Sequence, residues 1–167
     1  MKTLVLVRHA KSDWGNEALK DIDRHLNERG YADAYFMSDW YKKNMQQPDL
    51  IVSSAATRAL NTAFIFARKF DISESKVRIE ESVYESTTQN AIKIISQFDN
   101  SNNCVMLFGH NPCITNLANE LNKELMFDNI ATCGFVCIEF DINNWKDILR
   151  AKEGKLINYK FPKSFKQ

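Results

Sequence analysis

The stretch from Leu4 to Trp14 reads LVLVRHAKSDW, and its first half decides the fold. Four apolar residues, 4–7, run without a polar interruption, which is typical of a strand buried on both faces of a sheet. The run then ends abruptly in Arg8 and His9, a cation beside a titratable ring. Such strands belong to α/β proteins, in which ligands bind beyond the carboxyl ends of the strands. The sequence therefore predicts an α/β protein with polar chemistry at the end of its first strand.

Strand-like and helix-like patterns alternate along the rest of the chain. Further short apolar runs predict strands at 50–52, 77–79 and 105–108. Apolar stripes with helical spacing lie between them, at 60–70, 91–98 and 114–121, and another helix is expected after Gly30. Alternating apolar and polar residues at 136–142 and 157–161 predict two half-exposed strands near a sheet edge. This order predicts a three-layer αβα sandwich with a mostly parallel central sheet, formed by residues 1–167 as a single domain.

The composition excludes several classes of function. The 167 residues carry a formal net charge of +1, so no overall field attracts nucleic acid or an anionic membrane. No apolar run approaches the length of about 18 residues that suggests a membrane-spanning helix, and the N-terminus lacks the pattern of a signal peptide. The four cysteines match neither a tight zinc site nor a disulfide scaffold. We therefore expect reduced thiols in a cytoplasmic protein, with any anion bound locally.

A second strand end carries an arginine in an unusual place. Residues 53–58, SSAATR, follow the second expected strand, with Ser53 or Ser54 as the predicted N-cap of the next helix. Arg58 then lies near the first helical turn, where a cation is unfavourable by about 0.3–1 kcal/mol. No carboxylate in this segment offsets that charge. A local rule broken without compensation indicates function, and here the missing partner is an anion.

A third strand end carries a histidine. The run FGHNP at 108–112 closes the fourth expected strand, and Pro112 fits the first position of a helix. His110 and the backbone amide of Asn111 would then face a helix N-terminus, which favours anions. Any one of these basic residues is more often structural. Two arginines and two histidines on the same rim, however, would form a cationic pocket suited to phosphate.

These residues resemble the signature motifs of the histidine phosphatase superfamily, the phosphoglycerate mutase-like proteins. RHA at 8–10 stands where the family has RHG or RHA. The segments at 53–63 and 109–112 are similar to its second arginine motif and its GHNP motif. DRHLNERG at 23–30 is similar to its DRPLxxRG segment, with His25 in place of the usual proline. We interpret His25 as a structural or solvent-exposed residue.

Within the superfamily, the likeness is greatest to the small SixA-type phosphohistidine phosphatases and runs from Lys2 to about Pro162. It implies a metal-independent phosphatase in which His9 attacks phosphorus and forms a phosphohistidine that water hydrolyses. Arg8, Arg58 and His110 would hold the phosphoryl oxygens and stabilise the transition state. Cationic surroundings are expected to keep His9 unprotonated. Neither a metal nor a cofactor is implied, and no Walker or GxGxxG run is present.

Protonation of the leaving group is the open part of the chemistry. In the mutase-like enzymes, a glutamate downstream of the third strand is the acid. Here Glu80, Glu81 and Glu85 are candidates, and Glu85 fits the family pattern best. The alternative is that all three are solvated surface carboxylates. Asp13 in the first loop is a further candidate.

Two more residues and the choice of substrate complete the predictions. Ser12 and Asn111 are candidates for hydrogen bonds to the phosphate, with loop and helix capping as their alternative role. The leading hypothesis for the substrate is phosphohistidine in a protein, and neither nucleic acid nor a membrane is an expected partner. A phosphatase or, less readily, a mutase of small phosphate esters is the first alternative. A non-catalytic phosphate-binding module on the same fold is the second.

Overall fold

The computed structural model describes residues 1–151 and 153–166, and its six strands form one sheet. The strands are β1 (Lys2–Arg8), β2 (Leu50–Ser53), β3 (Arg78–Ile79), β4 (Cys104–Gly109), β5 (Phe135–Phe140) and β6 (Lys155–Lys160). The α-helices are α1 (Glu28–Asn44), α2 (Thr57–Lys69), α3 (Thr88–Ser96) and α4 (Cys113–Leu121). Short 3-10 segments are η1 (Asp21–Asp23), η2 (Glu74–Lys76), η3 (Glu81–Val83), η4 (Trp145–Leu149) and η5 (Pro162–Phe165). None of these described helices combines the length and the hydropathy that crossing a membrane requires.

The sheet is mostly parallel, as predicted. Its strand order is β3-β2-β4-β1-β5-β6, and the first four of these strands run parallel to one another. β5 pairs antiparallel with β1, and β6 pairs antiparallel with β5. The register places Arg8 beside Gly109 and Ser53 beside Phe108. The carboxyl ends of β1, β2 and β4 therefore meet at one edge, although they come from distant parts of the sequence.

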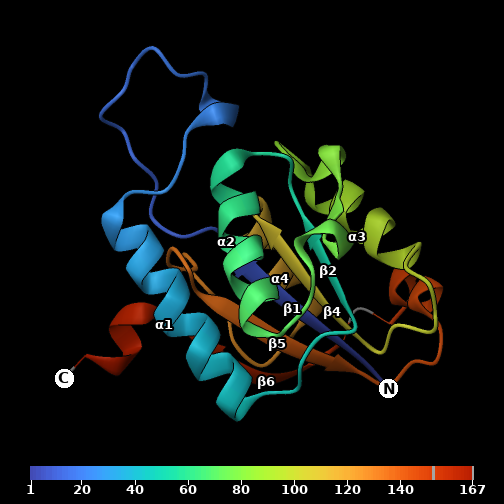
Figure 1. Cartoon of the computed structure of the whole chain (residues 1–167). Helices are drawn as coiled ribbons and strands as arrows, with labels where there is room; N and C mark the ends of the chain where they lie inside the picture. The colour runs from blue at the N-terminus through green and yellow to red at the C-terminus, as the bar shows by residue number, and fades with distance from the viewer. Residues whose placement is uncertain (152, 167) are drawn as a thin grey trace.

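Helices cover both faces of the sheet, which confirms the three-layer αβα architecture. α1 and α2 pack on one face, and Figure 1 shows them across the near side of the strands. α3, α4 and η4 pack on the other face. Within β1, Leu4 and Leu6 belong to the core on the α3 and α4 face of the sheet, whereas Val5 and Val7 belong to the core on the α1 and α2 face. This double burial explains why the strand reads as an unbroken apolar run.

The pattern at 136–142 is the part of the sheet that the sequence misrepresents. It predicted a half-exposed strand, but β5 is buried on both faces because β1 and β6 flank it and helices cover it. Cys137, counted as a polar-face residue, packs in the core beneath α1 and is only 3% exposed. The half-exposed pattern is real in β6, which is the edge strand.

Three helix starts differ from prediction by a few residues. α1 begins at Glu28, before Gly30, because Asn27 caps it and accepts a hydrogen bond from the Gly30 amide at 2.8 Å. The N-cap of α2 is Ala56, not a serine, and Pro112 is the N-cap of α4 rather than its first residue. The side chain of Ser54 is drawn into another role, described below.

The connection from β1 to α1 rises away from the body of the protein as a long loop, blue in Figure 1. A bridge between Ser12 and Leu26 closes its base. His25 is exposed, as expected. At Gly30 the loop and α1 approach so closely that an added Cβ would lie 2.0 Å from the carbonyl oxygen of Lys11. Only glycine fits there.

Candidate active site at the carboxyl edge of the sheet

A cavity of about 300 Å³ opens where β1, β2 and β4 end. Six of the residues predicted for the site lie in its lining, namely Arg8, His9, Ser12, Arg58, His110 and Asn111. Arg8 and His9 come from the end of β1, and His110 follows β4. Arg58 is the second residue of α2, in the first turn as predicted. The structure therefore brings together residues from Arg8 to Asn111, which are far apart in the chain.

His9 is held as a neutral ring with one nitrogen free. Its side chain is buried, and Nδ1 lies 2.8 Å from the carbonyl oxygen of Ala10. Because a carbonyl only accepts, Nδ1 carries the proton and the lone pair is on Nε2. Burial lowers the pKa of His9 to about 3, with smaller contributions from His110, Arg58 and Arg8. The direction agrees with the sequence prediction, but burial outweighs the cations that were expected to cause it.

His110 lies beside His9, with ring centroids 5.2 Å apart. Its Nε2 is 2.7 Å from Oγ of Ser54, and that oxygen also accepts a hydrogen bond from the amide of Ala56. The Ser54 hydroxyl can therefore donate its proton to Nε2, and in that arrangement the ring proton of His110 is on Nδ1. Burial, reinforced by Arg58, lowers the pKa of His110 to about 4.

Arg58 has the carboxylate partner that its own segment lacks. Its Nη1 donates to the backbone oxygen of Asp21 at 2.7 Å, and its Nη2 lies 3.1 Å from Oδ2 of the same residue. Asp21 belongs to the long loop and is 37 positions away in sequence. Hydrogen bonds from Tyr84 and then Arg24 hold the pKa of the Asp21 carboxyl well below its usual range. The sequence analysis gave no role to Asp21, Arg24 or Tyr84.

Asp21 joins the loop to the rim of the sheet through its carboxylate. Oδ1 accepts from Nη2 of Arg24 at 2.9 Å, and Oδ2 accepts from the Tyr84 hydroxyl at 2.6 Å. Arg24 also donates to Oγ of Ser12, and its guanidinium carbon lies 3.7 Å from the ring centroid of Trp14. The available signal was the spacing of Asp21 and Arg24, because oppositely charged residues three apart pair on one helical turn. No comparable spacing in the sequence indicated the contact between Asp21 and Arg58, which are 37 positions apart.

Buried donors without a partner gather around this cavity. Among the described residues, four buried side-chain polar atoms make no hydrogen bond, and three of them are Nε of Arg8, Nε of Arg58 and Nδ1 of His110. Arg8 uses only Nη1, which donates to the backbone oxygen of Ile130 at 2.9 Å. Folded proteins leave few buried donors unmatched, so this concentration indicates a site built for an acceptor-rich ligand. An anion such as phosphate matches it.

Asn111 has its predicted alternative role as well as a place in the cavity wall. Its amide nitrogen donates to Oδ1 of Asn129 and to the backbone oxygen of Ile130, at 2.9 and 3.0 Å. Its own Oδ1 accepts from the amide of Thr115 at 3.2 Å, which caps α4. These contacts occupy the side chain and fasten the end of β4 to the connection that precedes β5.

Glu85 lies outside this cavity, in the lining of an adjoining one of about 430 Å³ that shares Arg58 and His110. It is exposed, with a φ of 54°. Two of the other acid candidates have different partners: Glu80 pairs with Arg78 at 2.9 Å, and Asp13 accepts from the amide of Gly15 at 2.7 Å. Glu81 begins η3, is exposed, and does not line either cavity. Among the described residues, no group of three or more histidine, cysteine, aspartate and glutamate side chains is placed to hold a metal ion.

A neutral imidazole, a second imidazole and two guanidinium groups at the carboxyl edge of an α/β sheet form a site suited to a phosphoryl group. Residues 4–97, more than half of the 167-residue chain, match the family described as "Histidine phosphatase superfamily (branch 1)". The chain belongs to this superfamily.

Related sequences support the same assignment. An uncharacterized chloroplastic protein of Arabidopsis thaliana is 29% identical over 154 residues, which cover 87% of this chain and 70% of that protein. A 2,3-bisphosphoglycerate-dependent phosphoglycerate mutase of Cutibacterium acnes is 34% identical over 64 residues, which cover 37% of this chain and 26% of the mutase.

Solved structures extend the likeness to the whole fold. A candidate phosphohistidine phosphatase SixA from Agrobacterium tumefaciens superposes with a TM-score of 0.80 and 27% identity, covering 96% of this chain and 98% of that one. A protein histidine phosphatase SixA complexed with tungstate shares the fold with a TM-score of 0.82, at 16% identity and 98% and 99% coverage. The chain is a SixA-like member of its superfamily, and this membership supports a phosphatase that uses a histidine.

Proposed function

We propose that this protein hydrolyses phosphohistidine in a protein substrate through a covalent intermediate on His9. One observation carries the proposal: three unmatched buried donors, on Arg8, Arg58 and His110, belong to the wall of the cavity that contains His9. The tautomer of His9, with Nδ1–H donating to Ala10, leaves Nε2 as the nucleophile. Its lowered pKa keeps that lone pair available at neutral pH.

The chemistry follows in two displacements. In the first, Nε2 of His9 attacks phosphorus and forms an N–P bond while the bond from phosphorus to the substrate nitrogen breaks. The departing imidazole takes up a proton from solvent, and the guanidinium groups of Arg8 and Arg58 with Nδ1–H of His110 stabilise the equatorial oxygens. In the second, water attacks phosphorus and releases a proton to solvent, the N–P bond to His9 breaks, and phosphate leaves. Ser12, which lines the same cavity, is a further phosphate ligand in this proposal.

The leaving group separates the protein substrate from a small ester. An imidazole nitrogen leaves readily, whereas an alkoxide needs a general acid. Asp21 is unsuited to that role, because its hydrogen bonds keep it ionised. Glu85, in the cavity that shares His110, is the residue we assign to protonating an ester oxygen. Its position is the observation that favours small phosphate esters as the second candidate substrates.

We also propose a cytoplasmic location. Cys104, Cys113, Cys133 and Cys137 are all buried free thiols. A reducing compartment maintains thiols in that state.

Trapping the phosphoenzyme tests this function. The protein is mixed with a 32P-phosphohistidine protein or, separately, with a 32P-aryl phosphate, and each reaction is quenched in alkali, in which phosphohistidine is stable. We expect label on the enzyme that acid removes, stronger from the protein substrate than from the ester. His9→Ala should abolish both label and turnover, and the exposed His25 provides the matched control, since His25→Ala should keep both.

Three outcomes would contradict the proposal. Turnover that survives His9→Ala excludes the covalent step. Label from the aryl phosphate alone identifies an ester phosphatase. Phosphate binding without any turnover by the parent protein identifies a non-catalytic module.

A further inference from the structure

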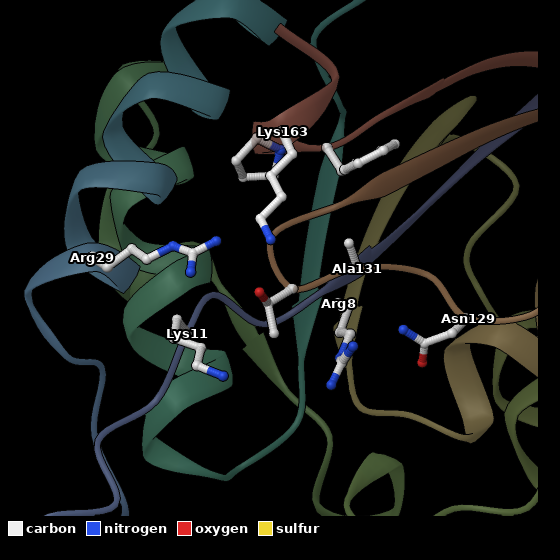
Figure 2. Close-up of a pocket in the computed structure, with 9 residues that line it drawn as sticks. Arg8, Lys11, Arg29, Asn129, Ala131 and Lys163 are labelled. Atoms are coloured by element: carbon white, nitrogen blue, oxygen red, sulfur yellow. The ribbon is translucent and has the colours of Figure 1, made fainter. Parts of the chain in front are cut away.

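Besides the catalytic cavity that contains His9 and the adjoining one that contains Glu85, the protein has a further cavity of about 270 Å³, drawn in Figure 2. We call it the second cavity, and it lies directly beside the catalytic cavity. The two cavities share Arg8, Lys11 and Thr132 in their walls. Beyond these, Arg29 and Lys163 line the second cavity only, so basic side chains dominate it. Arg8 stands between the two spaces, and an occupant of the second cavity would therefore lie next to a phosphoryl group bound in the first.

The basic residues reach this cavity from separate parts of the chain. Arg8 ends β1, Lys11 follows it in the loop, Arg29 lies in the first turn of α1, and Lys163 is in η5 near the C-terminus. Figure 2 shows the nitrogen atoms of Arg29 and Lys163 directed toward each other, with the side chains of Lys11 and Arg8 below them. In a protein whose net charge is only +1, this is a local concentration of like charges. Such a concentration is unfavourable until an anion occupies it.

The protein itself supplies little compensation for these charges. Within the part of the chain that the structure describes, no ion pair involves Lys11 or Lys163. Nε of Arg29 lies 3.5 Å from Oδ2 of Asp33, a separation that leaves the pair without a hydrogen bond. By contrast, the guanidinium of Arg58 in the catalytic cavity is matched by Asp21. The second cavity therefore keeps free donors for a ligand.

We propose that this cavity binds the carboxylate of an acidic side chain that lies close to the phosphohistidine on the protein substrate. The inference rests on the proposed function and adds a specificity site to it. Lys11, Arg29 and Lys163 are exposed, so a protein surface can reach them without a lid opening. Phe161 and Pro162 in the same wall give the methylene groups of a glutamate an apolar surface to contact.

Two phosphohistidine peptides test this site. They differ only in their flanking residues, glutamates in one and glutamines in the other, and kcat and KM are measured for both. The test variant is Arg29→Gln combined with Lys163→Gln, because neither residue lines the catalytic cavity. Exposed charge pairs contribute up to about 1 kcal/mol each, so we expect KM for the glutamate peptide to rise about five-fold. Its kcat, and both constants for the glutamine peptide, should change less than about two-fold.

Matched variants and salt complete the design. Lys43→Gln with Lys166→Gln removes two exposed positive charges from the same helix and the same terminal segment, outside the cavity lining. This control should leave the preference for the glutamate peptide intact. Raising the salt concentration should weaken the preference in the parent protein, because exposed charges are screened.

The results separate this inference from the function beneath it. Hydrolysis of both peptides with equal KM, or an equal rise in KM for both in the test variant, overturns the carboxylate site alone. Failure to hydrolyse either peptide, with aryl phosphate still turned over, overturns the protein substrate and the carboxylate site together. A preference for the glutamate peptide that only the Arg29 and Lys163 variant loses supports the site.

Discussion

The candidate active site is assembled from two regions with different physical character. One is the edge of the parallel strands, which supplies Arg8, His9 and His110 from positions fixed by the sheet register. The other is the loop between β1 and α1, which supplies Asp21 through a side chain that is half exposed. In the proposed mechanism, the first region carries the groups that contact the phosphoryl group, and the second orients Arg58 from outside the sheet edge. Reactivity therefore depends on the core of the fold, whereas alignment depends on an exposed connection.

Arg58 is where these two regions meet. Its backbone belongs to α2 and is packed against the sheet, but its guanidinium is held by the loop through Asp21. The comparison therefore predicts a ranking: changes at the sheet edge should have large effects, and changes in the loop network smaller ones.

After loss of the nucleophile in His9→Ala, the largest effect is expected for Arg58→Lys. A lysine keeps the charge but loses the planar fork that binds two oxygens at once. Loss of one transition-state donor reduces turnover by about 100-fold or more, so we expect kcat/KM on aryl phosphate to fall by about 100-fold. A fall of less than about threefold would place Arg58 outside the reacting groups.

Because His9 is buried and unprotonated, lowering the pH should reduce the free energy of unfolding. Because the pKa of His9 is lowered to about 3, the unfolded chain binds a proton at pH values where the folded protein does not. The free energy of unfolding therefore falls as the pH drops below about 6.5, by up to about 1.4 kcal/mol per pH unit for this residue. Urea unfolding between pH 6.5 and 4.5 should show a shallower slope in His9→Gln than in the parent. Identical slopes would mean that His9 is protonated in the folded protein.

Asp21→Asn should have a moderate effect. The variant keeps the shape of the side chain but loses the charge that binds Arg24 and Arg58. A less firmly oriented Arg58 should reduce kcat/KM by about five- to tenfold, because misplaced transition-state donors lose part of their effect. Asp23→Asn, in the same 3-10 segment, is the control and should match the parent. Equal activity of both variants would separate the loop from the chemistry.

The smallest effect is expected for Tyr84→Phe. Its hydroxyl contributes one hydrogen bond to Asp21, 2.6 Å long, while the edge-to-face contact of its ring with His110 is kept. One partly exposed hydrogen bond contributes about 0.5–1.5 kcal/mol, but here it acts on Arg58 only through Asp21. We expect kcat/KM to fall about two-fold, with Tyr31→Phe on α1 as the unchanged control. A fall as large as that of Arg58→Lys would reverse the ranking.

The same division explains how much the sequence could reveal. The buried parallel strands β1, β2 and β4 were predictable with their carboxyl-edge residues, because burial on both faces produces a continuous apolar run that ends in polar side chains. The run at 77–79 suggested a buried strand as well, but β3 is an exposed edge strand. β5 was not, since the small Cys137 packs in the core yet alternates as if it were solvent-facing. The predicted helix starts were wrong because the Ser54 side chain contacts His110, and because Asn27, three residues before Gly30, caps α1.

The partner of Arg58 lay beyond local reasoning for a different cause. Its pairing with Asp21 depends on where a long loop folds, and no periodic pattern encodes that path. The charge of Arg58 indicated an anion near it, and the anion that the structure shows is the Asp21 carboxylate. The sequence did not reveal that the protein itself provides a carboxylate for the Arg58 guanidinium. It also did not reveal that Nε of Arg58 still has no hydrogen-bond partner.

Gly30 lines neither the catalytic cavity nor the second cavity, but a substitution at Gly30 would change the shape of both. A side chain there would collide with the backbone of Lys11, and Lys11 lines both the catalytic cavity and the second cavity. Even an alanine must displace that backbone, moving the Lys11 ammonium and the entry to the loop together. We therefore expect this fold to be sensitive to substitution of Gly30, a small residue on a helix that lies outside the reacting groups.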